Sequence, residues 1–152
     1  MTIWVDADAC PGEVKSLLYK AALRCRIPVV LVANAVLNPP KSEFISTVLV
    51  PQGMNIADRK IVELAQPGDL VITADVPLAA DVVAKGATAL DPRGMLYTRE
   101  TVGARLASRN LMDNLRGEGV ITGGGPSNYA QKERQAFANN LDRWLAKQPR
   151  PS

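Results

Sequence analysis

The stretch TIWVDADACP, Thr2 to Pro11, decides the fold. Its beginning, Thr2 to Val5, is a short apolar run rich in strand formers, which is typical of a strand buried on both faces. Asp6 ends that run, and Pro11 suits the first position of a helix. A second apolar run follows at Val29 to Ala33. Between the two runs, apolar residues recur at the spacing of one helix face, at Val14, Leu17, Leu18, Ala21, Ala22 and Cys25. The segment therefore predicts a strand, a helix and a second, parallel strand.

The same alternation continues through the first 92 residues. Strands that alternate with helices imply a parallel sheet covered by helices on both faces. The last third is different, because it predicts two long helices around a glycine loop. The fold class predicted is thus α/β, a three-layer parallel-sheet domain with C-terminal helices. The further predicted strands are Ile45 to Val50, Leu70 to Ala74 and Ala87 to Leu90, and the predicted helices are about Asn55 to Ala65, Pro77 to Lys85, Arg99 to Arg116 and Asn128 to Lys147.

Composition predicts one globular domain over residues 1–147, followed by a frayed tail at 148–152. The chain has 152 residues, of which 47% are hydrophobic and 22% charged. It has no histidine and two cysteines, which excludes the usual zinc ligand sets and any catalysis by imidazole. Two cysteines do not form a disulfide framework, so a reducing cytoplasm is expected. No stretch reaches the roughly 18 apolar residues of a membrane span, so a membrane partner is not expected.

Charge is unevenly placed along the chain. Residues 1–92 hold 8 Lys+Arg against 10 Asp+Glu, whereas residues 93–152 hold 10 against 5. This pattern favours an acidic, metal-holding body and a basic C-terminal part, about residues 93–147, that binds polyanions. The alternative is a solvated helical tail that happens to be rich in arginine and lysine.

Four aspartates are the candidate metal ligands. Asp6, Asp8 and Asp75 follow predicted strands at their carboxyl ends, where open parallel sheets bind ligands. Asp58 lies on the apolar face of its own predicted helix, where a carboxylate is costly unless it is paired or bound to metal. Converging carboxylates raise one another's pKa, and a hard divalent cation, Mg²⁺ or Mn²⁺, neutralises them. Such a cation activates water and stabilises charge on a phosphoryl group.

Each aspartate also has a purely structural alternative. Asp75 suits the N-cap of the helix that follows it, and Asp58 suits the third position of a helix capped by Asn55. Asp8 fits a turn before Pro11. Cys10 is better explained as a small packed thiol than as a nucleophile, because no histidine is present to act as its base.

The last third supplies candidate phosphate contacts. Arg105, Arg109 and Arg116 share one face of a predicted helix, and guanidinium groups favour bidentate phosphate binding. Gly123 and Gly124 belong to a loop that can present backbone N–H groups to an anion. Taken alone, these glycines are more typical of a flexible loop between helices.

Several of these motifs occur together in one known family. The motifs are DADACP (Asp6–Pro11), Val32-Ala33-Asn34, Ala57-Asp58, GDLVITADVPLAA (Gly68–Ala80), Pro92-Arg93-Gly94 and TGGGP (Thr122–Pro126). In this combination the chain resembles the YaiI/YqxD family of bacterial proteins, from Ile3 to about Leu145. That family, itself of unknown function, is grouped with PIN-like and NYN-like domains. The resemblance implies a PIN-like α/β fold, whose characterised members are often Mg²⁺- or Mn²⁺-dependent ribonucleases.

The resemblance also implies roles for particular residues. Asp6 resembles the acid of the first strand, Asp58 the acid at the start of the mid-chain helix, and Asp75 the acid after the fourth strand. Asn34 resembles the polar residue that often ends the second strand. One position departs from the pattern, because Pro77 stands where many PIN-like nucleases carry a further acid.

Three functions follow as hypotheses. The first is a metal-dependent nuclease, acting on RNA rather than DNA, with Asp6, Asp58 and Asp75 as catalytic residues and Asp8 as a further ligand that compensates for Pro77. The second, favoured by Pro77, is a non-catalytic RNA-binding or regulatory protein. The third is a phosphatase in which Asp6 is the nucleophile and Asp8 the general acid. The natural substrate, the number of metal ions and the oligomeric state stay open.

Overall fold

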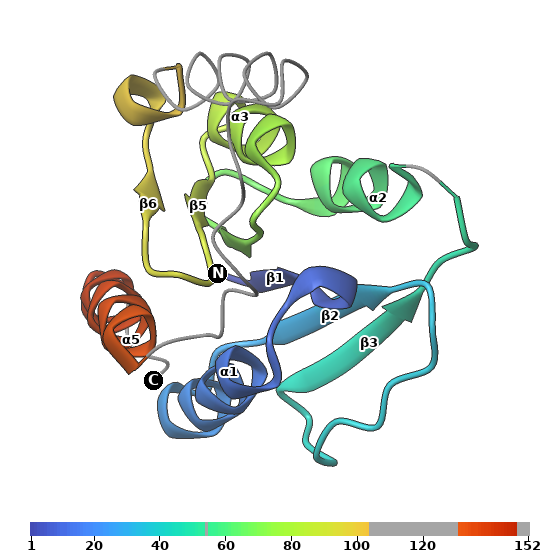
Figure 1. The fold of residues 1–152 in the computed structure, drawn as a ribbon. Coiled ribbons are helices and arrows are strands. Elements are labelled where there is room, and N and C mark those ends of the chain that lie inside the picture. The colour runs from blue at the N-terminus through green and yellow to red at the C-terminus, as the bar shows by residue number, and fades with distance from the viewer. Residues whose placement is uncertain (54, 104–130, 149–152) are drawn as a thin grey trace, which may run out of the picture.

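A computed structural model describes residues 1–53, 55–103 and 131–148 of the chain. Up to residue 90 strands and helices alternate, except that no helix separates the strands at 29–33 and 45–49, and Figure 1 shows their arrangement. The strands are β1 (Ile3–Asp6), β2 (Val29–Ala33), β3 (Ile45–Leu49), β4 (Leu70–Ile72), β5 (Thr88–Leu90) and β6 (Leu96–Tyr97). The helices are the 3-10 turn η1 (Ala7–Ala9), α1 (Gly12–Cys25), α2 (Ile56–Leu64), α3 (Val76–Ala84) and α5 (Gln131–Ala146).

The six strands form one sheet in the order β3-β2-β1-β4-β5-β6. All neighbouring strands run parallel except β6, which is antiparallel to β5. β1 is central, because Ile3 pairs with Val29 of β2 on one side and with Leu70 of β4 on the other. Chain order reverses between β1 and β4. This is the topological switch point, where open α/β sheets bind ligands beyond the carboxyl ends of the strands.

Helices cover both faces of the sheet. α1 and α5 lie together on one face, and α2 and α3 lie on the other (Figure 1). Successive side chains of a strand point to opposite faces, so Val5 packs with the α1 and α5 cluster while Trp4 packs with the α2 and α3 cluster. The chain is therefore an α/β domain of three layers with a mostly parallel sheet, as the resemblance to PIN-like domains predicts.

The described structure differs from the predicted one at several boundaries. Pro11 is the residue before α1 rather than its first residue, because its ψ of 147° is extended. Strand β4 ends at Ile72, two residues early, and the N–H of Asp75 donates to Oγ1 of Thr73 at the turn into α3. Gly86, with φ +96°, ends α3 in the left-handed region, as predicted. The hairpin strand β6 was not predicted.

The C-terminal third is described in part. Residues 99–103 are helical, which agrees with a helix that begins at Arg99, and α5 lies within its predicted range. The candidate phosphate contacts of this third lie outside the described residues; they are Arg105, Arg109, Arg116, Gly123 and Gly124. Among the helices that the structure describes, none combines the length and apolarity needed to cross a membrane.

Candidate active site

Asp6 is the last residue of β1 and lies at the switch point. Its side chain is buried, at 9% exposed, although a carboxylate at this depth is costly. Its Oδ2 accepts a hydrogen bond of 3.2 Å from Oγ1 of Thr73, which follows β4. The same hydroxyl oxygen accepts the N–H of Asp75 at 3.0 Å. Thr73 thus ties the ends of β1 and β4 together at the predicted position of the site.

The pKa of Asp6 shows that the predicted acids lie within electrostatic reach of one another. The pKa of Asp6 is raised from its ordinary 3.8 to about 6, mainly by burial and then by the negative charges of Asp58, Asp75 and Asp8, in that order of effect. The hydrogen bond from Thr73 lowers it. Asp6 is therefore a carboxyl group that changes its charge close to neutral pH.

Asp58 is the third residue of α2 and is half-buried. Burial raises its pKa, and so do the charges of Asp75 and Asp81. Asn55 is the residue before α2, as predicted, but it does not cap the helix. Its backbone is in the left-handed region, with φ 64°, and its side chain forms no capping hydrogen bond. The capping arrangement that would explain Asp58 structurally is therefore not formed.

Asp75 and Asp8 do have structural partners. Oδ1 of Asp75 accepts the N–H of Leu78 at 2.9 Å, so Asp75 is the N-cap of α3, as its structural alternative predicts. Oδ2 of the exposed Asp8 accepts the N–H of Asn34 at 2.9 Å, which ties η1 to the end of β2. Each of these bonds uses one of the two carboxylate oxygens. Asn34 itself is exposed.

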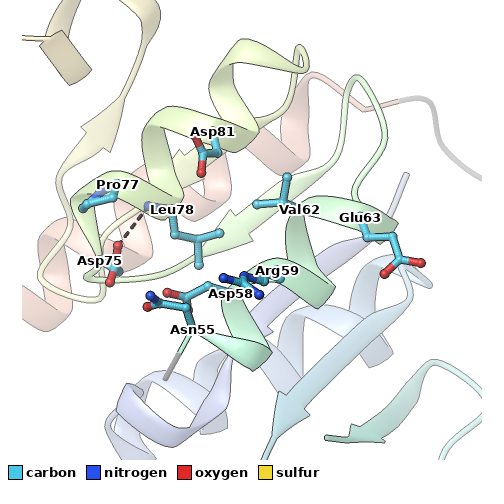
Figure 2. A pocket seen from close by; sticks show the side chains of 9 residues that line it. All are labelled: Asn55, Asp58, Arg59, Val62, Glu63, Asp75, Pro77, Leu78 and Asp81. Carbon is cyan, nitrogen blue, oxygen red and sulfur yellow. Dashed lines mark hydrogen bonds between the residues drawn. The ribbon is translucent and has the colours of Figure 1, made fainter. Parts of the chain in front are cut away.

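A pocket of about 650 Å³ opens between α2 and α3, and Figure 2 shows the side chains around it. Four carboxylates and one cation line it. Asp6 and Asp8 are not among the lining residues, so the pocket brings together two of the four predicted acids. The lining residues are Asn55, Asp58, Arg59, Val62, Glu63, Asp75, Pro77, Leu78 and Asp81.

Sequence reasoning missed three charged residues of this pocket: Arg59, Glu63 and Asp81. The signal for Asp81 is helical spacing, because it follows Pro77 by four residues and therefore shares its face of α3. Asp81 therefore lies one helical turn after Pro77, the position at which many PIN-like nucleases carry a further acid. Arg59 follows Asp58 directly, and only the packing of α2 against α3 shows that it lines the same pocket.

None of the four predicted acids forms an ion pair within the described part of the chain. The ion pairs found there join Arg24 to Asp142 and Lys60 to Glu63. Among the described residues, however, no group of three or more acidic or thiol side chains is spaced to hold a metal ion. A cation here would use one or two carboxylates and keep water at its other positions, which is how Mg²⁺ is usually bound. The oxygen-only donor set fits such an ion.

Two other buried aspartates show what structural carboxylates look like in this fold. Asp69 accepts three hydrogen bonds, from the N–H groups of Thr2 and Gln66 and from Nε1 of Trp4. Asp91, at the carboxyl end of β5, accepts from the N–H of Arg93 and the hydroxyl of Tyr97 and was not predicted. Asp6 is also buried but accepts one such hydrogen bond, from Thr73, so hydrogen bonding alone does not compensate the burial of its carboxylate.

Cys10 does not contribute chemistry to this site. Its side chain is 9% exposed, and burial raises its pKa to about 12. The thiol therefore stays protonated at neutral pH, when it is a poor nucleophile. The prediction that Cys10 is a small packed thiol is confirmed.

Fold and geometry together define an α/β domain with aspartates gathered at the switch point of a parallel sheet. Residues 4–147 match the family described as "Uncharacterized BCR, YaiI/YqxD family", and the chain belongs to that family. No solved structure gives a significant match.

The relatives cover the whole chain. A "UPF0178 protein" from Alkalilimnicola ehrlichii is 57% identical over 145 residues, which span 95% of this chain and 97% of the relative. One from Shewanella amazonensis is 55% identical over 150 residues, 99% and 100% of the two chains. The "UPF0178 protein YaiI" of Escherichia coli is 54% identical over 147 residues, 97% and 96% of the two chains. These names describe a family and state no activity.

Proposed function

We propose that this protein is a Mg²⁺- or Mn²⁺-dependent nuclease that hydrolyses phosphodiester bonds, with RNA as its substrate. The observation that carries the proposal is Asp6, a buried carboxyl group with one hydrogen-bond donor and three other aspartates within electrostatic reach. Groups perturbed by burial and by like charges concentrate at functional sites, because ordinary packing selects against them. The resemblance to PIN-like domains supports the same chemistry.

The proposed roles follow from position. Asp6, Asp58 and Asp75 surround the proposed cation site, where one or two of them would hold the cation directly and Asp8 would contribute through its charge. A bound cation would polarise a phosphoryl oxygen and lower the pKa of water. A carboxylate of this group that does not ligate the cation would accept a proton from the attacking water. Hydrolysis then forms a bond from the water oxygen to phosphorus and breaks one ester P–O bond, whose oxygen leaves with a proton.

Substrate contacts are proposed on two parts of the chain. Arg59 lines the acidic pocket and is positioned to bind a phosphate oxygen there. Asn34, at the end of β2, is proposed to contact the same strand. Three arginines and two glycines of the C-terminal third, outside the described residues, are proposed to hold the flanking backbone of the RNA; they are Arg105, Arg109, Arg116, Gly123 and Gly124.

Cleavage of a labelled single-stranded RNA tests the proposal. The wild-type protein is expected to cleave it only with Mg²⁺ or Mn²⁺ present, and Asp6→Asn is expected to lower the rate by at least about 100-fold. Asp142→Asn, which removes an exposed carboxylate of α5 paired with Arg24, is the matched control and should cleave at the wild-type rate. Equal cleavage by wild type and Asp6→Asn would exclude Asp6 as a catalytic residue.

A second candidate is a non-catalytic RNA-binding or regulatory protein. Two observations favour it: Asp75 is engaged as a helix cap, and Pro77 replaces an acid of the PIN-like pattern. Here the expected result is RNA affinity that falls with salt, because phosphate contacts release counterions, without any cleavage. The phosphatase hypothesis is less well supported, since one carboxylate oxygen of Asp8, its proposed general acid, already accepts the backbone N–H of Asn34.

The proposed location is the cytoplasm. Cys10 and Cys25 are both free thiols, and free thiols persist in a reducing compartment.

A further inference from the structure

A second cavity, of about 710 Å³, lies at the opposite end of the sheet from the acidic site. Met1, Gly68 and Thr88, which line it, precede or begin the parallel strands β1, β4 and β5. Its outer wall is the C-terminal half of α5, and β6 contributes Leu96. Figure 1 shows α5 and β6 on the same side of the molecule, away from α2. The cavity is thus distinct from the pocket between α2 and α3.

Among the described residues, the charged side chains that line this cavity are all positive. They are Arg99, Arg143 and Lys147. Within the described part of the chain none of these three cations is paired with an acid. Asp142, the acid next to Arg143 in sequence, pairs instead with Arg24 of α1 at 3.1 Å. The described lining of the cavity therefore carries a net positive charge, which attracts anions.

Helix dipoles do not account for this arrangement. Arg143 and Lys147 lie at the C-terminal end of α5, where cations are favourable in any case. Arg99, however, begins the helical segment 99–103, and a cation is unfavourable at a helix N-terminus. An anion bound in the cavity would compensate the charge of Arg99 at the helix N-terminus together with the charges of Arg143 and Lys147.

The remaining lining combines polar anchors with an apolar wall. Nδ2 of Asn140 donates to the carbonyl oxygen of Gly94, and its Oδ1 accepts from Nη1 of Arg143 at 3.5 Å. This contact orients the guanidinium beside the cavity. Trp144 and the half-exposed Met1 add apolar surface. A ligand that fits both features has an anionic group and a flat or apolar body.

We propose that this cavity binds a phosphate-bearing small molecule of nucleotide size. Its volume lies within the roughly 300–1,000 Å³ of small-molecule sites, and guanidinium groups match phosphate geometry in two-pronged hydrogen bonds. The apolar wall takes the base or an equivalent ring. Because the cavity is remote from Asp6, binding here is a property separate from the proposed nuclease activity.

Calorimetric titration with AMP tests the proposal. AMP is expected to bind, and Arg143→Gln and Arg99→Gln are each expected to weaken its affinity by about tenfold or more. Arg134→Gln removes an exposed charge on the same helix outside the cavity, so it should change the affinity by less than about twofold. Adenosine and inorganic phosphate, which each carry half of the recognised chemistry, should bind more weakly than AMP. Asp6→Asn should bind AMP like the wild type.

Several outcomes would overturn the proposal: no binding of AMP at millimolar concentration, equal binding by the wild type and both arginine variants, or adenosine or phosphate binding as tightly as AMP. Arg99 and Arg143 are exposed, so their variants are expected to fold, and thermal unfolding of each variant verifies this. Loss of RNA cleavage without loss of AMP binding would bear on the proposed function alone.

Discussion

Asp6 stores unfavourable free energy in the native state. Its pKa is about 6 in the folded chain against an ordinary 3.8, so the native state holds its proton more tightly than the unfolded state does. The favourable contribution of the protonated form is complete below pH 4 and is lost as pH rises through 6. Ionised Asp6 therefore destabilises the fold at neutral pH, by about 1–3 kcal/mol.

Replacing this carboxylate should stabilise the protein. Asp6→Asn keeps an acceptor for the hydroxyl of Thr73 and removes the charge, so we expect it to raise the free energy of unfolding at pH 8 by about 1–3 kcal/mol. The gain should shrink towards pH 4, where wild-type Asp6 is protonated. Urea unfolding of both proteins at the two pH values measures it. A gain of the same size at both pH values would show that the charge is not its source.

Two substitutions distinguish the role of Asp75 as a helix cap from the role of its negative charge. Asparagine caps helices as well as aspartate does, so Asp75→Asn should change stability by less than about 0.5 kcal/mol, whereas Asp75→Ala loses the bond to Leu78 and about 1 kcal/mol. Both variants should lose metal-dependent cleavage. Thermal unfolding and the RNA assay together distinguish these effects. Full activity in Asp75→Asn would mean that this residue is a cap only.

The two cysteines should differ in reactivity. Cys10 is buried with a pKa near 12, whereas Cys25 is partly exposed. A thiol reagent such as dithionitrobenzoate is expected to modify one thiol in the native protein and both after denaturation. Mass spectrometry of the native product should place the label on Cys25, and rapid labelling of Cys10 would contradict the packing described here.

At the scale of single elements, one glycine controls how α5 docks. Gly94 lies in the turn before β6 with φ +99°, and a Cβ there would approach Cβ of Ala136 to 2.5 Å and the backbone nitrogen of Phe137 to 2.7 Å. Both the backbone conformation and the space require glycine. We expect Gly94→Ala to lower the free energy of unfolding by about 2–4 kcal/mol.

The matched control is Gly12→Ala. Gly12 begins α1, and no atom lies within 4 Å of its added Cβ. This variant should be neutral or slightly stabilising, by up to about 1 kcal/mol, because alanine favours the helix. Urea unfolding compares the two variants. A Gly94→Ala protein as stable as the wild type would contradict the close packing of α5 on the turn.

Which elements could be predicted depends on how local their signals are. Helix α1 and the buried strands follow from periodicity within a dozen residues, and both matched the prediction closely. Strand β6 could not be predicted, since its two residues, one of them exposed, carry no alternation. It is a strand because the turn at Asp91 and Gly94 pairs it with β5, which is a tertiary cause.

The same distinction applies to the candidate site. Asp6 and Asp75 were predictable because a residue after a buried strand must lie at the carboxyl edge of the sheet. Asp81 and Arg59 were not, because their place depends on how α2 packs against α3. Helical spacing from Pro77 would have indicated the face of Asp81, but not what that face contacts.

At the scale of the whole molecule, the sheet separates two kinds of charge. Carboxylates lie beyond the carboxyl ends of β1 and β4. Arginine and lysine lie near the amino ends of the parallel strands, around the cavity that α5 borders. Such a polarity orients a polyanion, since one end repels phosphate until a cation is bound and the other attracts it. Binding of RNA by the whole chain should therefore increase on adding Mn²⁺ and fall with added salt.

Anomalous diffraction from a crystal soaked in Mn²⁺ tests the central claim, that a hard cation neutralises the aspartates gathered at the switch point of the sheet. The expected result is one strong anomalous peak within about 2–2.5 Å of a carboxylate oxygen of Asp6, Asp58 or Asp75, which disappears in Asp6→Asn crystals. No peak near these residues at a Mn²⁺ concentration that saturates other Mn²⁺ enzymes, or a peak that persists in Asp6→Asn, would contradict it.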